Sequence, residues 1–267
     1  KELEKLINKN TAVVIISGPN FPNGMMDPID KIAAITKDKE VGLHHDNCLG
    51  GFLAGAIDYK PYGFIEGLTS MSVDTHKYGY APKGTSLVLI RENLKEYLPK
   101  QNLRGRRSSA NLASTWAALH RIGLEGYKQT AQNILKVSKY IRGEVAKIPQ
   151  IEILGNPNED EPHWVIALGW KEGDKKNIYK VLHYMHSKGG WSLSGLIDPE
   201  ALHIALTRMH TQKGVAEKFC TDLQDAVSFV SNTPTASGGD MLPIYGFAGS
   251  SKMASKGLVK HLLRYYI

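Results

Sequence analysis

The sequence predicts an α/β fold built around a mostly parallel β-sheet. In the first hundred residues, short β-branched or apolar runs alternate with segments of helical periodicity, which is typical of parallel strands joined by helices. A long helical segment follows, and then a smaller mixture of strands and helices. We therefore expect residues 1–125 to form part of a large sheet domain, and residues 126–267 to form a linking helix and a smaller C-terminal α+β domain.

Four runs in the first part are expected to be strands. Residues 11–17 are β-branched and end in Gly18-Pro19, which is typical of a buried parallel strand followed by a loop. Asp27 and Pro28 then predict the start of a helix, with Asp27 as the N-cap and Pro28 as the first helical residue. The other strands are expected at residues 41–44, 68–73 and 85–90.

Helical periodicity dominates the middle of the chain. Apolar residues share one face from 108 to about 147, with a break between Gly123 and Gly126. Beyond it we expect two strands and two further helices, and then a Pro/Ser/Gly loop that leads into a last helix. These elements are expected at residues 163–168, 202–207, 178–188, 213–232, 233–240 and 253–266.

The loop after the third strand carries the most informative residues. It runs from Asp74 to Gly84 and places Lys77 directly after His76, among small and polar residues. A lysine held in such a loop is typical of one that forms a Schiff base with an aldehyde, and pyridoxal phosphate is the common protein-bound aldehyde. The simpler alternative, a solvated loop lysine, does not explain the histidine that precedes it.

A carboxylate upstream supplies the partner that such a lysine needs. Asp46 follows a short apolar run and precedes Gly50 and Gly51. An acid beside a pyridine nitrogen keeps the ring protonated and makes it a better electron sink. The spacing between Asp46 and Lys77 allows one helix or loop and one strand, so both can lie at the carboxyl edge of a parallel sheet, where ligands bind. Taken alone, Asp46 would be an ordinary strand-end aspartate.

These motifs resemble the pyridoxal-phosphate-dependent group II decarboxylase family. The resemblance covers residues 17–24, 44–52 and 69–89 and shorter matches further along, and so spans nearly the whole chain. His76-Lys77 marks the wider family, whereas the longer string from Asp74 to Gly84 is similar to its lyase branch. The resemblance implies a fold-type I large domain, a pyridoxal 5'-phosphate cofactor and a homodimer with shared active sites. It also implies retro-aldol cleavage of a phosphorylated sphingoid base.

The resemblance also assigns roles to single residues. Lys77 and His76 are expected to be catalytic, and the base that starts the cleavage is left open between His76 and a tyrosine. Lys83 and Tyr78 are expected at the substrate phosphate, because a lysine point charge suits phosphate. The expected cofactor contacts are Lys77, Asp46, His76, Cys48, His44, Thr75 and Gly105. Plainer alternatives stay open: a surface position for Lys83, packing for Tyr78 and an ordinary strand histidine for His44.

Some features of the family are not visible in the sequence. The Gly-Ser/Thr turn that holds the cofactor phosphate is absent upstream of Asp46, so we expect the chain to begin within the large domain. The join near Lys100-Gln101 is shorter than its equivalent in the family, which predicts a missing loop. Asn47 also departs from the family pattern, where alanine is common.

Composition excludes several other classes of protein. The chain has 267 residues, 42% of them apolar and 22% charged, which is ordinary for a globular protein. No apolar run approaches the length of a membrane span, and residues 1–6 are too charged for a signal peptide. Two cysteines without metal-ligand neighbours predict a reducing compartment and no metal site. We expect a cytoplasmic or cytosol-facing protein, membrane-anchored at the endoplasmic reticulum if a eukaryotic full-length form exists.

The net charge of +7 needs a partner of opposite sign. The densest basic cluster, Arg104 to Arg107, is short and lacks interleaved aromatic residues, which argues against nucleic acid. A phosphorylated substrate, or peripheral contact with an anionic membrane, fits better. Gly79, Lys83 and Gly84 do not form a nucleotide-binding P-loop, in which the lysine follows the second glycine.

Two other functions are kept as alternatives. The first is an amino-acid decarboxylase of the same fold, which a comparison of products would separate from a lyase. The second is a catalytically silent scaffold or binding protein built on the same fold, against which the intact Asp46 and His76-Lys77 argue.

Overall fold

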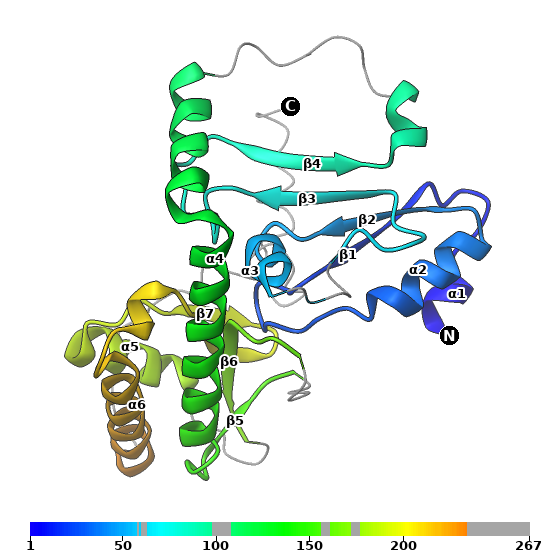
Figure 1. The fold of residues 1–267 in the computed structure, drawn as a ribbon. Coiled ribbons are helices and arrows are strands. Elements are labelled where there is room, and N and C mark those ends of the chain that lie inside the picture. Colours follow the sequence, from blue (N-terminus) through cyan, green and yellow to red (C-terminus); the bar gives the residue numbers. More distant parts are fainter. Residues whose placement is uncertain (58, 60–62, 98–107, 156–160, 172–176, 234–267) are drawn as a thin grey trace, which may run out of the picture. The chain divides into compact units, whose positions relative to one another are not determined.

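The computed structural model describes residues 1–57, 59, 63–97, 108–155, 161–171 and 177–233 (Figure 1). These residues form two compact units. The first holds Lys1–Phe21 and the described residues of Met25–Asn133, and the second holds Pro22–Gly24 and the described residues from Ile134 onward. The expected division at residues 125/126 stays a prediction, and one helix, α4, runs across it.

The first unit contains a four-stranded sheet with the order β1-β2-β3-β4 (Figure 1). Its strands are β1 (Val13–Ser17), β2 (Gly42–Asp46), β3 (Ser70–Asp74) and β4 (Ser86–Ile90). The first three are parallel and β4 is antiparallel to β3. Each lies at one of the four expected positions, so the prediction of a mostly parallel sheet is confirmed.

The predicted N-cap at Asp27 is wrong. Helix α2 (Ile29–Asp38) has Pro28 as its N-cap residue, without a capping side chain. The Asp27 carboxylate instead accepts hydrogen bonds from the backbone N–H of Ser17, at 2.8 Å, and from the side-chain amide of Asn20, at 3.4 Å. These hydrogen bonds hold the loop that leaves β1. They occupy the carboxylate that would otherwise cap the helix.

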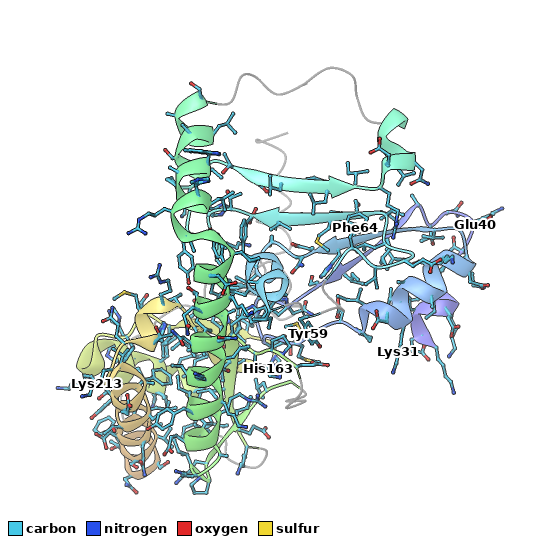
Figure 2. The ribbon with its side chains drawn as sticks, in the orientation of Figure 1. Lys31, Glu40, Tyr59, Phe64, His163 and Lys213 are labelled. Atoms are coloured by element: carbon cyan, nitrogen blue, oxygen red, sulfur yellow. The ribbon has the colours of Figure 1, made fainter. Side chains whose placement is uncertain are left out.

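Three short helical segments of the first unit were not expected. They are α1 (Glu2–Leu6), α3 (Gly51–Ala56) and the 3₁₀ segment η2 (Glu92–Tyr97). Arg91, directly after β4, donates hydrogen bonds to the carbonyls of Leu68 and Ile65. Both carbonyls belong to the segment between α3 and β3. The Arg91 guanidinium lies 5.2 Å from the ring centre of Phe64, which Figure 2 labels.

Two glycines allow close approaches beside the strand ends. A Cβ atom at Gly51 would lie 2.7 Å from a methyl group of Val73, so α3 packs on β3 only because this residue has no side chain. A Cβ atom at Gly79 would lie 2.3 Å from the Thr75 carbonyl oxygen and 2.8 Å from the Phe52 ring. Gly51 therefore sets how closely α3 packs on β3, and Gly79 sets how tightly the segment after β3 is folded.

Helix α4 (Ser109–Val145) contains the predicted break. Gly123 has φ +64° and ψ 171°, which is not helical, so the helix is kinked there. Trp116 before the kink and Leu124 directly after it are exposed, whereas Ile134 and Ile141 further along the helix are fully buried. Tyr127 donates a hydrogen bond to the Gly79 carbonyl at 2.7 Å and so attaches α4 to the segment after β3.

The second unit contains an antiparallel sheet with the order β5-β6-β8-β7. Its strands are β5 (Ile151–Ile153), β6 (Val165–Trp170), β7 (Ser194–Ile197) and β8 (Glu200–Ala205). Helices α5 (Ile178–Gly189) and α6 (Val215–Asn232) lie side by side, and the 3₁₀ segment η3 (Arg208–Thr211) precedes α6 (Figure 1). The expected strands and helices of this region are present, whereas β5 and β7 were not expected. The loop and helix expected beyond residue 233 lie outside the described residues.

No helix within the described ranges is long and apolar enough to cross a membrane. The same residues contain no group of three or more His, Cys, Asp or Glu side chains placed to hold a metal ion.

Candidate active site at the ends of β2 and β3

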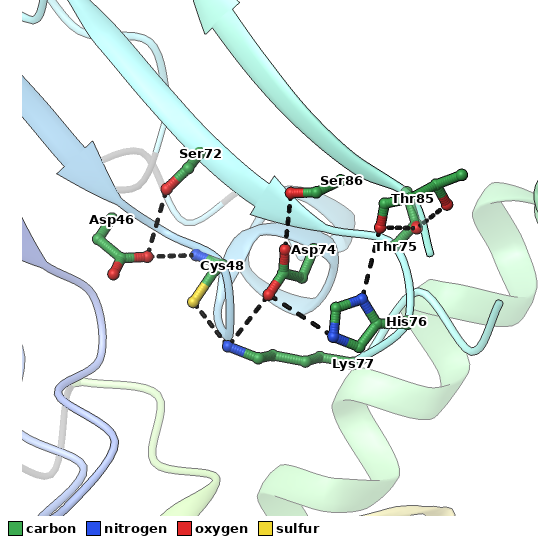
Figure 3. A network of polar contacts seen from close by, with 9 residues as sticks. All are labelled: Asp46, Cys48, Ser72, Asp74, Thr75, His76, Lys77, Thr85 and Ser86. Atoms are coloured by element: carbon green, nitrogen blue, oxygen red, sulfur yellow. Dashed lines mark hydrogen bonds and ion pairs between the residues drawn. The ribbon is translucent and has the colours of Figure 1, made fainter. Parts of the chain in front are cut away.

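The two residues singled out from the sequence lie at one edge of the parallel sheet. Asp46 is the last residue of β2 and is in register with Ser72 of the neighbouring parallel strand β3. Lys77 lies three residues beyond Asp74, where β3 ends. Figure 3 shows the carboxylate of Asp46 and the amine of Lys77 on either side of Cys48. The structure thus brings together the acid, the lysine and the cysteine that the sequence predicted.

Asp46 is held by donors on one of its two oxygens. Oδ1 accepts from the backbone N–H of Cys48 at 3.1 Å and from the Ser72 hydroxyl at 3.3 Å (Figure 3). Burial alone would raise the pKa of Asp46, but hydrogen bonds from Cys48 and Ser72 and the charge of Lys77 outweigh it and lower the pKa. The residue is therefore ionised at neutral pH. Neither of these two hydrogen bonds uses Oδ2.

His44 acts on Asp46 through a serine. One ring nitrogen, Nδ1, lies 2.8 Å from the Ser70 hydroxyl, and the other, Nε2, lies 3.3 Å from the Ser72 hydroxyl. Because the Ser72 hydroxyl donates to Asp46, the histidine and both serines form a polar support beside the carboxylate. A direct contact between His44 and a cofactor stays a prediction.

Lys77 is fixed by two neighbours. Its amine donates to the Cys48 sulfur at 2.7 Å and lies 3.2 Å from Oδ2 of Asp74 (Figure 3). Burial would lower the pKa of Lys77, but Cys48 and Asp74 together raise it above its ordinary value. Burial, reinforced by Asp46, also raises the pKa of the Cys48 thiol. An amine and a thiol in contact, both protonated, therefore lie beside an ionised carboxylate.

Asp74 is a site residue that reasoning from the sequence missed. Its Oδ1 accepts from the Ser86 hydroxyl at 2.8 Å, and its Oδ2 lies 3.2 Å from the Lys77 amine and 3.8 Å from Nε2 of His76. The signal was present in the sequence, since an acid three residues before a lysine at a strand end can turn back onto it.

A chain of threonine hydroxyls supports the residues that follow β3. Thr75 is fully buried, donates to the Thr85 carbonyl at 2.8 Å and shares a 2.5 Å contact with the Thr85 hydroxyl. That hydroxyl lies 2.7 Å from the hydroxyl of Thr115 in α4. The Thr75 hydroxyl thus has partners within the protein, and its predicted contact with a cofactor stays a prediction.

The remaining predicted residues differ in access to solvent. Tyr78 is buried, which raises the pKa of its hydroxyl, and its ring lies edge-on to Tyr80. Lys83 is exposed. The structure thus favours Lys83 over Tyr78 as a group that a dissolved substrate can reach. Gly105 and the basic cluster around it lie outside the described residues.

Comparisons with known proteins bear on what this edge of the sheet does. The model of the class-V aminotransferase family matches residues 1–116, which include both strand ends. Among curated proteins, the sphingosine-1-phosphate lyase of Oryza sativa is 36% identical, and the alignment covers 98% of this chain and 50% of the relative. Sphingosine-1-phosphate lyase 1 of Rattus norvegicus is 35% identical over 93% of this chain and 46% of its own length. Over nearly its whole length the chain is similar to the sphingosine-1-phosphate lyases.

Solved structures agree with this relationship. The sphingosine-1-phosphate lyase of Burkholderia pseudomallei superposes with a TM-score of 0.74 at 34% identity, over 85% of this chain and 54% of that one. A glutamate decarboxylase of Lactobacillus brevis superposes with a TM-score of 0.71 at 19% identity. At that identity the likeness shows a shared fold and not a shared activity. The predicted fold class, the predicted resemblance and the pyridoxal phosphate cofactor shared by these families are confirmed. The chain spans about half the length of the curated lyases that it matches.

Proposed function

We propose that this chain carries the lysine-bearing part of a pyridoxal-phosphate-dependent carbon–carbon lyase. Its substrate would be sphingosine 1-phosphate or a related phosphorylated sphingoid base, and its products a long-chain aldehyde and phosphoethanolamine. One observation carries the proposal. The carboxylate of Asp46 and the amine of Lys77 lie at the ends of adjacent parallel strands, with Cys48 between them. The lyases related to this chain support the choice of substrate.

The side chains at the strand ends fit this cofactor. A pyridinium ring needs an ionised acid to accept its N–H, and Asp46 is such an acid whose Oδ2 takes neither of the hydrogen bonds from Ser72 and the Cys48 backbone. An aldehyde needs an amine nearby, and Lys77 supplies one on the far side of Cys48.

When bound, the cofactor supplies an electron sink for the bond that breaks. The chain's own residues perform the rest. Asp46 would hold a proton on the ring nitrogen, Lys77 would hold the cofactor through its amine, and His76, which faces the same Asp74 oxygen as that amine, would move protons. Lys83, exposed and six residues beyond Lys77, would attract the substrate phosphate. Tyr78 and Thr75, which are buried, would support the segment after β3 by packing.

Assembly and location follow from the same proposal. We expect a homodimer whose subunits share active sites, with the loop around Gly105 reaching the partner's cofactor. We also expect a cytosol-facing protein that touches the membrane surface where its substrate resides. The net charge of +7 suits an anionic surface.

The replacement Lys77→Ala tests the proposal. We expect the variant to lose both sphingoid-base cleavage and the absorbance at about 420 nm that the wild type gains with pyridoxal phosphate. Lys37→Ala is the matched control, because Lys37 is an exposed lysine of the same unit that pairs with Glu66. Turnover and absorbance that survive in Lys77→Ala would refute the assignment.

An amino-acid decarboxylase is the second candidate, since a glutamate decarboxylase shares the fold. Lys83 favours the lyase, because a decarboxylase has no need for a second cation near Lys77. Mass spectrometry of the products formed from sphingosine 1-phosphate, glutamate and aromatic amino acids separates the two. Carbon dioxide released from an amino acid, with no aldehyde from the phosphorylated base, would favour the decarboxylase.

A further inference from the structure

Asp74 is an acid of the site that has no role in the reaction proposed above. It ends β3, and its two oxygens have different partners. The Ser86 hydroxyl of the antiparallel neighbour β4 holds Oδ1 at 2.8 Å, while Oδ2 faces the Lys77 amine at 3.2 Å and His76 Nε2 at 3.8 Å. The carboxylate is mostly buried, with 18% of its side chain exposed. A carboxylate anchored on one side and shared between two basic groups on the other is built to orient them.

The ring of His76 faces acceptors on both sides. Nδ1 lies 3.4 Å from the Thr85 carbonyl oxygen, and Nε2 faces Oδ2 of Asp74. A carbonyl and a carboxylate can only accept, so an N–H at either ring nitrogen of His76 would face an acceptor. Asp74 is the acceptor on the Nε2 side of the ring, and the same carboxylate oxygen faces the amine of Lys77.

The surroundings of Lys77 contain other groups that act on its charge. Asp46 and the Cys48 sulfur lie on the side of β2, and Asp74 lies on the side of β3. Cys48 and Asp74 raise the pKa of Lys77 against the effect of burial. An amine must lose its proton before it can attack an aldehyde carbon, so the group that holds the charged amine also controls how readily it reacts.

We propose that Asp74 is a positioning residue for the reaction, and this rests on the function proposed above. While the amine of Lys77 is free, Asp74 holds it as an ammonium ion close to Cys48. If the amine were committed to the cofactor, Oδ2 of Asp74 would keep His76 as its remaining basic neighbour. Asp74 therefore orients Lys77 in one state of the site and His76 in the other, and Ser86 keeps the carboxylate in place in both.

The test measures how reactive the Lys77 amine is in the cofactor-free full chain. Trinitrobenzenesulfonate serves as the amine probe at pH 8, and peptide mass spectrometry assigns the label to Lys77. We expect Asp74→Asn to be labelled about three- to tenfold faster than the wild type, because a charged partner of the ammonium ion is lost. Asp74→Glu keeps the charge, so its labelling rate should lie close to that of the wild type. Glu66→Gln removes an acid that pairs with Lys37 instead and should leave the rate unchanged.

Ser86→Ala provides a second variant that leaves the acid in place. It removes only the 2.8 Å hydrogen bond to Oδ1, so labelling should rise in the same direction but less, by about twofold. Equal labelling of Lys77 in the wild type, Asp74→Asn and Ser86→Ala would overturn the proposal. If Asp74→Asn does not fold, Ser86→Ala decides by itself.

A separate measurement distinguishes this proposal from the proposed function. Pyridoxal phosphate is added to the wild type, and its covalent retention on Lys77 is measured by mass spectrometry after borohydride reduction. No retention on Lys77 would end the proposed function, whatever the labelling rates are. Retention in the wild type together with unchanged labelling in Asp74→Asn would end only the role of Asp74.

Discussion

The carboxylates that end β2 and β3 lie at the same edge of one sheet but have different surroundings. Asp46 accepts hydrogen bonds from Ser72 and the Cys48 backbone on Oδ1, and neither of them uses Oδ2. Asp74 uses both oxygens, one for Ser86 and the other for Lys77 and His76. The difference indicates that Asp46 can accept a further hydrogen bond from a ligand, whereas Asp74 already serves the protein.

The largest expected effect breaks this comparison at Asp46. The replacement Asp46→Asn removes the charge that would keep a pyridine nitrogen protonated, so we expect turnover to fall about 100-fold or more. Steady-state kinetics with sphingosine 1-phosphate measures this. Asp74→Asn is the matched variant and should lose less, because it acts on positioning. A greater loss in Asp74→Asn than in Asp46→Asn would reverse the roles assigned to the two acids.

A second prediction concerns stability and uses the histidine beside Asp46. His45 is fully buried, and burial, partly offset by Asp46, lowers its pKa from 6.5 to about 4. The unfolded chain therefore takes up a proton below pH 6.5 that the folded chain refuses, so stability is lost as the pH falls from 6.5 towards 4. The loss is on the order of 3 kcal/mol. Urea unfolding at a series of pH values measures it, and His45→Gln should flatten this part of the curve. An unchanged slope in the variant would show that other groups cause it.

A third prediction tests the packing that brings β3 beside the site. Gly51→Ala places a Cβ atom 2.7 Å from a Val73 methyl group, and crowding of this kind costs about 1–3 kcal/mol. Gly55→Ala, in the same helix α3, meets nothing within 4 Å and should be neutral or stabilising by up to about 1 kcal/mol. Denaturant unfolding compares the two variants. Similar losses in both would mean that the helix backbone, and not the contact with β3, limits the substitution.

The smallest expected effect sharpens the comparison between the two strand ends. Ser72 supports Asp46 and Ser86 supports Asp74, each through one hydroxyl. Ser72→Ala should lower the affinity for pyridoxal phosphate about threefold, because the hydrogen bond to Oδ1 and the link to His44 are both lost. Titration followed by absorbance measures it. A larger effect of Ser86→Ala on the same affinity would count against a special role for Asp46.

Much of this arrangement could be predicted from the sequence because its signals are local. The β-branched runs located the strands of the parallel sheet, and the spacing of Asp46 and Lys77 placed both at one edge. Strands β5 and β7 were not predicted, since three or four residues such as Ile151–Ile153 are too few for a pattern of their own. They exist because β6 and β8 offer them edges with which to pair.

The remaining errors arose where a residue has a distant partner. Asp27 has the residue type and position of a helix cap, but the N–H of Ser17, ten residues earlier, takes its carboxylate. Asp74 had no assigned role because its value depends on Ser86, which only the pairing of β3 with β4 brings opposite it. Contacts of this kind follow from strand register, which a single sequence does not reveal.

The contact between the Cys48 sulfur and the Lys77 amine has a practical consequence. An alkyl group attached to that sulfur would occupy the space that the amine needs, so alkylating reagents should inactivate the chain. Because the raised pKa keeps the thiol protonated at neutral pH, inactivation by iodoacetamide should be slow and should accelerate in alkaline solution. A bound flat ring would cover the sulfur, so the rate of alkylation would report how many molecules in a preparation are loaded.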